Sequence, residues 1–158
     1  QIYTGMRPQE LCLLRLENVH ISEGWMMGGM KTESGFNRLI PIHPEIIDLI
    51  QNAYENASSI NSSYLFNDPV ARDHPNITYD MYRHRFHHAM DAMKMDHVPH
   101  DCRHTFITYA KKSGIDPYDL KRIVGHKIYD VTEKVYTHTS LEDLKKAITM
   151  FKISEQEN

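Results

Sequence analysis

The chain has 158 residues, of which 41% are hydrophobic, a size and composition typical of one globular domain with a substantial core. No apolar run approaches the ~20 residues of a membrane span, so a membrane protein is not expected. The two cysteines are too few for a disulfide framework, and we therefore expect a cytoplasmic location. Because 21 acidic residues outnumber 18 Lys and Arg residues, composition alone does not indicate a nucleic-acid-binding protein, and a basic surface has to come from local clusters.

The first predicted helix begins at Pro8, because proline suits the first helical position and Glu10 near the start complements the helix dipole. Arg7 then stands at a helix N-terminus, where the dipole also favours a phosphate group. The alternative interpretation is a solvated surface arginine, and only a second arginine at the same place favours phosphate binding over it.

Three short apolar runs between turn signals predict a small antiparallel sheet, with strands near residues 19–21, 25–30 and 39–42. Lys31 would lie at the end of the second strand, in the hairpin loop. A lysine in a hairpin is usually a solvated charge, so position alone assigns it no chemistry.

Two helices are predicted next, over residues 44–56 and 78–94. In the second, four apolar side chains recur at helical spacing and predict a core-facing stripe: Tyr82, Phe86, Met90 and Met93. Its other faces carry Arg83, Arg85 and several histidines, which suit contacts to DNA phosphates. An ordinary solvated face fits any one of them equally well.

The next two predicted helices have clear start and stop signals. After Pro99 a helix covers residues 100–113 and closes at Gly114. The following helix begins at Asp116, a capping residue before a first-turn proline, and ends at Gly125.

Two more helices are predicted in the last part of the chain. Thr132 would cap a short helix that carries Tyr136, and Ser140 would start a final helix with an apolar face that ends near Phe151. The predicted fold is therefore mainly α with a small three-stranded antiparallel sheet near the N-terminus, an α+β architecture.

The stretch from His100 to Tyr136 concentrates residues suited to phosphate chemistry. Arg103 has a planar fork of donors that can grip two oxygens of one phosphate, and His100, three residues earlier, shares its face if a helix starts here. His126 follows a helix-ending glycine on an exposed turn. The Tyr136 phenol is a poor nucleophile at its free pKa of about 10, but flanking cations and a nearby base make it usable. Together these residues, without a carboxylate cluster for a metal, indicate attack on a phosphodiester through a covalent phosphotyrosine.

Other interpretations stay open on the residues alone. His100, Cys102 and His104 could bind a metal in a metal-dependent hydrolase, although their spacing does not match the common zinc patterns. Tyr136 alone could be a half-buried structural tyrosine. Tyr129, three residues after His126, is a rival nucleophile.

Five segments, in order, resemble the catalytic domain of the tyrosine recombinases, the phage integrase family. They read Thr4-Gly-Met-Arg7-Pro-Gln-Glu10-Leu, Lys31-Thr32, His100-Asp-Cys-Arg103-His104-Thr-Phe, Gly125-His126-Lys and Thr132-Glu-Lys-Val-Tyr136-Thr-His. Each segment is weak alone, whereas all five at family-like spacing are specific. The resemblance extends from Thr4 to about Phe151.

The resemblance implies a metal-independent, cofactor-free enzyme with six catalytic residues: Arg7, Lys31, His100, Arg103, His126 and Tyr136. Tyr136 would attack the scissile phosphate and keep a 3′-phosphotyrosyl bond, while the two arginines clamp the non-bridging oxygens. Lys31 would protonate the 5′-hydroxyl leaving group. His100 would accept the tyrosine proton, and His126 would donate a hydrogen bond to the phosphate. Tyr136 fits the family's spacing better than Tyr129.

The implied function is site-specific DNA recombination, as in integration or excision of a mobile element or phage; the alternative is an inactive DNA-binding module derived from such an enzyme. DNA contacts are expected from five basic side chains: Arg38, Arg83, Arg85, His104 and Lys127. The implied partners are double-stranded DNA, further copies of the chain in a tetramer held through the C-terminal helix, and, in some systems, accessory DNA-bending proteins.

Residues 1–158 would be an N-terminally incomplete catalytic domain, with a separate N-terminal DNA-clamping domain absent. Weak DNA affinity is expected because half the clamp is missing.

Overall fold

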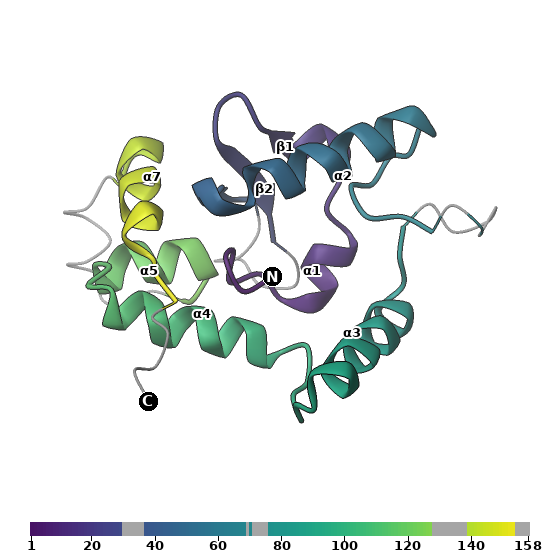
Figure 1. Cartoon of the computed structure of the whole chain (residues 1–158). Coiled ribbons are helices and arrows are strands. Elements are labelled where there is room, and N and C mark those ends of the chain that lie inside the picture. Colours follow the sequence, from purple (N-terminus) through teal and green to yellow (C-terminus); the bar gives the residue numbers. More distant parts are fainter. Residues whose placement is uncertain (30–36, 69, 71–75, 128–138, 154–158) are drawn as a thin grey trace.

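The computed structural model of the chain describes residues 1–29, 37–68, 70, 76–127 and 139–153 (Figure 1). The helices are α1 (Pro8–Cys12), α2 (Ile47–Ser59), α3 (Tyr79–Met93), α4 (Asp101–Lys112), α5 (Pro117–Val124) and α7 (Leu141–Met150), with short 3-10 turns η1 (Leu16–Asn18) and η2 (Pro44–Ile46). The strands are β1 (Val19–His20), β2 (Trp25–Gly28) and β3 (Arg38–Pro41). The predicted mainly helical fold with a small antiparallel sheet is confirmed.

The sheet has the order β1-β2-β3 with antiparallel neighbours. Met26 faces Val19 on one side and Ile40 on the other, and all three side chains are buried. They form the centre of a first core with Met6, Leu14, Ile42, Ile50 and Leu65, which we call the sheet core. Residues 30–36 between β2 and β3, which include Lys31, lie outside the described part of the chain.

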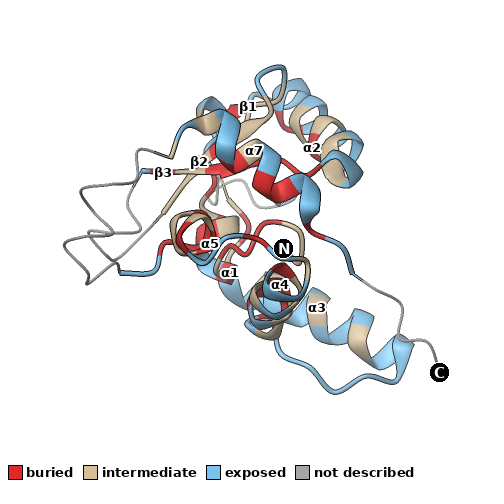
Figure 2. Cartoon of the chain, turned by 90° about the vertical axis from the view of Figure 1, so that its left-hand side faces the viewer, coloured by how far each residue is buried: buried red, intermediate tan, exposed pale blue. Residues whose placement is uncertain are grey.

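A second core, which we call the helical core, joins α4, α5 and α7. Its buried members include Phe106, Ile123, Val124, Ile148 and Phe151. Figure 1 shows these helices grouped on one side of the molecule, with the sheet and α2 on the other, and Figure 2 shows buried stretches on α4, α5 and α7 in red. Strand β3 contacts both α5 and α7, so it is the seam between the two cores.

The last helix packs on its own domain. Ser140 caps α7 as expected, because its hydroxyl accepts a hydrogen bond from the Asp143 backbone N–H at 3.2 Å. At the other end the fully buried ring of Phe151 lies 4.9 Å from the Phe106 ring and 5.4 Å from the Tyr3 ring, centroid to centroid. The buried His43 accepts the Glu45 N–H at Nδ1, so its Nε2 carries the proton and donates to the Phe151 carbonyl at 3.1 Å.

Replacing Phe151 by alanine is therefore expected to lower the free energy of unfolding by about 3–5 kcal/mol, because it removes a buried aromatic ring and leaves a cavity. Chemical denaturation would measure the loss. Ile153→Ala, which truncates a side chain 39% exposed, is the control, and we expect it to change the unfolding free energy by less than about 0.5 kcal/mol. Equal effects of the two substitutions would contradict the role of Phe151 in closing the helical core.

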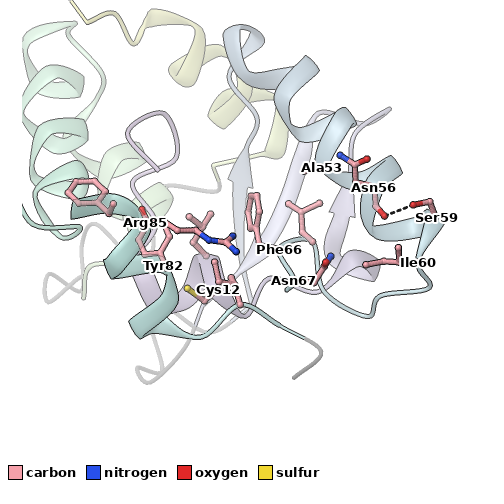
Figure 3. Close-up of a pocket in the computed structure, with 13 residues that line it drawn as sticks. Cys12, Ala53, Asn56, Ser59, Ile60, Phe66, Asn67, Tyr82 and Arg85 are labelled. Atoms are coloured by element: carbon pink, nitrogen blue, oxygen red, sulfur yellow. Dashed lines mark hydrogen bonds between the residues drawn. The ribbon is translucent and has the colours of Figure 1, made fainter. Parts of the chain in front are cut away.

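Helix α3 differs from the prediction. It runs over Tyr79–Met93 close to the predicted bounds, but none of its residues is buried, and Met93 is 55% exposed. The predicted core-facing stripe is therefore wrong as a statement of burial: periodicity places side chains on one face and says nothing of what covers that face. Tyr82 and Phe86 line a cavity of about 730 Å³ together with residues of α1, α2 and the Leu65–Asn67 segment (Figure 3).

None of the helices in the described ranges is long and apolar enough to cross a membrane.

Candidate functional site

Arg7 occupies the capping position of α1, as the sequence predicts. Its backbone N–H donates to Glu10 Oε2 at 3.0 Å, and its side-chain Nη1 donates to Glu10 Oε1 at 2.8 Å. The Arg7 side chain remains 32% exposed. Since α1 has only five residues, its dipole adds little, and the guanidinium itself is what Arg7 offers to an anion.

Glu10 is a buried carboxylate that two arginines share. Arg38 grips it with two bonds, Nη1 to Oε1 at 3.1 Å and Nη2 to Oε2 at 2.6 Å. Burial alone would raise the pKa of Glu10, but the hydrogen bonds and charge of Arg38, followed by the backbone and side-chain hydrogen bonds of Arg7, hold it below its usual value. Glu10 is therefore ionised at neutral pH. Sequence reasoning treated it only as a helix-start residue; the signal for its contact with Arg7 was the i, i+3 spacing of a capping box.

Arg38, expected at the DNA surface, lies inside the molecule with a side chain only 5% exposed. Besides its two bonds to Glu10, its Nε donates to the carbonyl of Ile123 at 2.9 Å. Ile123 is in the last turn of α5. Arg38 thus links β3 to both α1 and α5 from a buried position, whereas the Arg7 side chain is partly exposed.

Arg103 is 2% exposed on the first turn of α4. Its Nη1 donates to the Gly5 carbonyl at 2.7 Å, while its Nη2 has no hydrogen-bond partner among the described residues. Burial, then the charges of Arg7 and Arg38, lower the pKa of Arg103 to about 10, so it stays charged at neutral pH. A buried cationic donor without a partner is costly, and an anion is the ligand that relieves it.

The contact between Arg103 and Gly5 depends on glycine. Gly5 has a φ of +61°, and a Cβ there would lie 2.5 Å from Cδ1 of Phe106. Only glycine combines this backbone conformation with so close an approach to the helical core. Gly5 was part of a recognised sequence segment, but nothing local showed that its carbonyl holds Arg103.

His100 precedes α4 as its capping residue, so the predicted helix start is confirmed. Its ring lies 5.0 Å from the ring of the exposed His104 in an edge-on arrangement. Partial burial lowers the pKa of His100, and the charges of His104, Arg103 and Arg7 lower it further against the opposing effect of Asp101. His100 is therefore a neutral imidazole at pH 7, the form that can accept a proton.

His126 follows the turn that closes α5. Gly125 has a φ of +69°, the left-handed conformation that ends a helix, as predicted. His126 is exposed. Its pKa is lowered by partial burial first, and then by the charges of Arg103, Arg7, Lys111 and Arg38. Because the charges of Arg7 and Arg103 lower the pKa of both histidines, the four side chains form one positively charged neighbourhood, which we call the phosphate cradle after the ligand proposed for it below.

The structure therefore brings together four of the six expected catalytic residues. Lys31 and Tyr136, with the rival Tyr129, lie outside the described residues. Among the expected DNA contacts, Lys127 and His104 are exposed close in sequence to the cradle, whereas Arg83 and Arg85 are exposed on α3, which packs against α1. Arg83 pairs with Asp80 at 3.3 Å, and Arg85 borders the cavity beside Tyr82 (Figure 3).

In the described part of the chain, no group of three or more His, Cys, Asp or Glu side chains could hold a metal ion. The two cysteines, Cys12 and Cys102, are buried and free.

Known proteins resemble this chain in sequence and in fold. The chain spans about half the length of the relatives it matches. Tyrosine recombinase XerA of Pyrococcus furiosus is 27% identical over 147 residues, covering 92% of this chain and 50% of that protein. The integrase from mycobacterium phage Brujita superposes with a TM-score of 0.71 at 18% identity, covering 96% of this chain and 48% of that one. The Tn1549 transposon integrase in complex with circular intermediate DNA has a TM-score of 0.67 at 22% identity, covering 92% and 53%.

The family comparison covers most of the chain. Residues 1–142 match the phage integrase family, a span that includes the buried Glu10–Arg38 pair and all four side chains of the phosphate cradle. This chain belongs to the phage integrase family.

Proposed function

We propose that this chain carries out the DNA breaking and rejoining of a site-specific recombinase through a covalent phosphotyrosine. The observation that carries the proposal is Arg103, a charged fork at 2% exposure whose Nη2 has no partner among the described residues. A phosphate oxygen would supply that partner. The relatives are tyrosine recombinases, and the Tn1549 integrase has been seen with DNA, so the phosphodiester of DNA is the anion we assign.

The cradle supports a defined sequence of events. Tyr136 Oη attacks the scissile phosphorus, neutral His100 takes its proton, and the bond to the 5′-oxygen breaks as Lys31 protonates that oxygen. Arg7 and Arg103 stabilise the charge that develops on the non-bridging oxygens, and His126 adds a hydrogen bond. The roles of Lys31 and Tyr136 come from the family motifs. Attack of a 5′-hydroxyl on the phosphotyrosine reverses the steps and rejoins DNA, so no nucleotide or metal cofactor is required by the chemistry.

We further propose that this chain works together with a second DNA-binding domain and with further copies of itself. Residues 1–158 act as the catalytic domain, and a separate clamping domain contributes the other DNA face. Exposed Arg83, Arg85, His104 and Lys127 contact the DNA backbone. Integration or excision of a mobile element requires several copies on DNA. Because the apolar face of α7 is buried in the helical core, self-association through this helix would use its exposed face or an exchange of the whole helix between copies.

The lowered pKa values of His100 and His126 predict how DNA affinity depends on pH. A phosphate in the cradle favours the imidazolium form, so DNA binding raises both pKa values from their lowered positions and takes up protons. Affinity must then increase as the pH falls from 7.5 through about 6.5. Fluorescence anisotropy at a series of pH values would measure this slope. We expect the double variant His100→Gln/His126→Gln to have a shallower slope than the wild type, whereas an unchanged slope would assign the effect to the other histidines.

A covalent trap tests the proposed function directly. The protein is incubated, with a chelator present, with a pool of randomised duplexes that each carry a nick, so that cleavage releases a short strand and rejoining is prevented. Adducts that survive detergent are isolated and the attached DNA is sequenced. A detergent-stable adduct enriched for one DNA sequence supports the proposal. DNA binding without any adduct would support the inactive-module alternative, and an adduct seen only without chelator would support a metal-dependent enzyme.

A further inference from the structure

Two arginines bind Glu10, and they differ in how they hold it and in how far they are exposed. Arg38 uses its whole fork, with one nitrogen on each carboxylate oxygen at 3.1 and 2.6 Å, and its side chain is 5% exposed. The guanidinium of Arg7 makes a single bond to Glu10, from Nη1 to Oε1 at 2.8 Å, beside the bond from its backbone N–H to Oε2 at 3.0 Å, and the Arg7 side chain is 32% exposed. The carboxylate is therefore held mainly by the buried Arg38, and the partly exposed Arg7 uses only one guanidinium nitrogen, Nη1, on Glu10.

We propose that Arg38 is a positioning residue of the active site: it neutralises Glu10, so that Glu10 can orient Arg7 without cancelling the charge that Arg7 offers to a phosphate. This inference rests on the proposed function. It gives Arg38 a role behind the phosphate cradle in place of the direct DNA contact expected from the sequence.

The charges of the three side chains explain why the second arginine matters. With Arg38 present, two guanidinium groups and one carboxylate leave a net charge of about +1 next to the phosphate site. Without Arg38, Arg7 and Glu10 would form a neutral pair. Both carboxylate oxygens would also become available to Arg7, and the two-pronged geometry that arginine and carboxylate prefer would draw its guanidinium inward. The site would lose both charge and placement.

Arg38 also connects two elements that carry cradle residues. Its third bond, from Nε to the Ile123 carbonyl at 2.9 Å, reaches the last turn of α5, just before His126. One side chain thus fixes the start of α1, which holds Arg7, relative to the end of α5. Lysine at this position would keep the charge but could not make three bonds in these fixed directions.

A double-mutant cycle separates positioning from general structural support. Single-turnover cleavage of saturating nicked DNA is measured for the wild type, Arg38→Met, Arg7→Ala and the combined variant, below the melting temperature of each. We expect Arg38→Met to slow cleavage roughly tenfold to a hundredfold, since small misplacements of catalytic groups have effects of that size. In the Arg7→Ala background we expect Arg38→Met to have less than about a threefold effect, because coupled residues do not act additively. The same factor in both backgrounds would overturn the proposal.

Two further variants make the comparison sharper. Arg38→Lys restores charge without the fork, and we expect it to fall between the wild type and Arg38→Met. Glu10→Gln/Arg38→Met removes the carboxylate that would neutralise Arg7, and we expect faster cleavage than with Arg38→Met alone. Arg15→Met is the matched control, because Arg15 makes an exposed pair with Glu17 at 3.5 Å, and its loss should leave cleavage unchanged.

A measurement without cleavage keeps this inference separate from the proposed function. The side-chain Nε–H resonance of Arg7 is followed by NMR while inorganic phosphate is added. We expect Arg38→Met to shift this resonance in the free protein and to weaken its response to phosphate severalfold, while Arg15→Met changes neither. An Arg7 resonance and phosphate response identical to the wild type in Arg38→Met would overturn the positioning role, whether or not the wild type cleaves DNA. A wild type without any DNA adduct would instead count against the proposed function.

Discussion

Replacing Tyr136 by phenylalanine is expected to abolish the covalent adduct with nicked DNA. The substitution removes one oxygen, the proposed nucleophile, and keeps the aromatic ring, so the cleavage rate should fall by at least about 10⁴-fold. DNA affinity should change by less than about twofold, because positioned arginines and not the phenol provide the attraction to phosphate. Gel electrophoresis under denaturing conditions measures the adduct, and anisotropy measures binding.

Tyr129→Phe provides a matched control for the same experiment. It removes the same atom from a tyrosine seven residues earlier in the chain, and we expect it to retain adduct formation. An adduct lost in Tyr129→Phe and kept in Tyr136→Phe would reassign the nucleophile. Loss in both variants would mean that neither result reports the attacking atom, and peptide mapping of the wild-type adduct would then identify it.

Replacing Arg103 by methionine is expected to separate activity from stability. The loss of one preorganised donor group at a developing anion typically slows an enzyme by 10²–10³-fold, and Arg103 supplies both a donor and a charge, so we expect cleavage to fall by at least about 10³-fold. Stability should behave differently. The variant gives up the bond to the Gly5 carbonyl but also removes a buried charge whose Nη2 lacks a partner among the described residues.

The unfolding free energy of Arg103→Met should therefore lie within about 1 kcal/mol of the wild type, or above it, because replacing a poorly satisfied buried charge by an apolar side chain is often neutral or stabilising. Chemical denaturation measures this quantity, and the nicked-DNA assay measures cleavage on the same preparation. A strongly destabilised Arg103→Met protein would show that the guanidinium serves the fold and would weaken its assignment as a phosphate ligand.

The parts of the structure that local chemistry marks could be predicted from the sequence. Asp116 accepts hydrogen bonds from the N–H groups of Tyr118 and Asp119, and Gly125 adopts the left-handed conformation that ends α5, as their residue types suggest. The capping role of Ser140, whose hydroxyl accepts from the Asp143 N–H, follows the same logic. In each case the interacting groups are only a few residues apart, so the pattern contains both partners.

The features that depend on distant partners could not be predicted in this way. Arg38 is 28 residues from Glu10 and 85 from Ile123, and nothing near it in sequence shows that its guanidinium is buried. The prediction that the apolar stripe of α3 is buried fails for the related reason that the described elements cover this stripe only in part. Residue type, spacing and the family motifs singled out four side chains that the fold places in one neighbourhood, whereas the buried carboxylate and arginine behind them required the fold.

The seam at β3 has a consequence for the folding of this chain. Arg7 adjoins the sheet core through its neighbour Met6, whereas Arg103 and His126 are carried by helices of the helical core. Neither core by itself brings the two arginines together. A chain that is only half folded, during synthesis or after heat damage, therefore lacks the arrangement needed to grip a phosphodiester. For the strand-cleaving activity proposed above, this division would keep incompletely folded copies from nicking the DNA they meet.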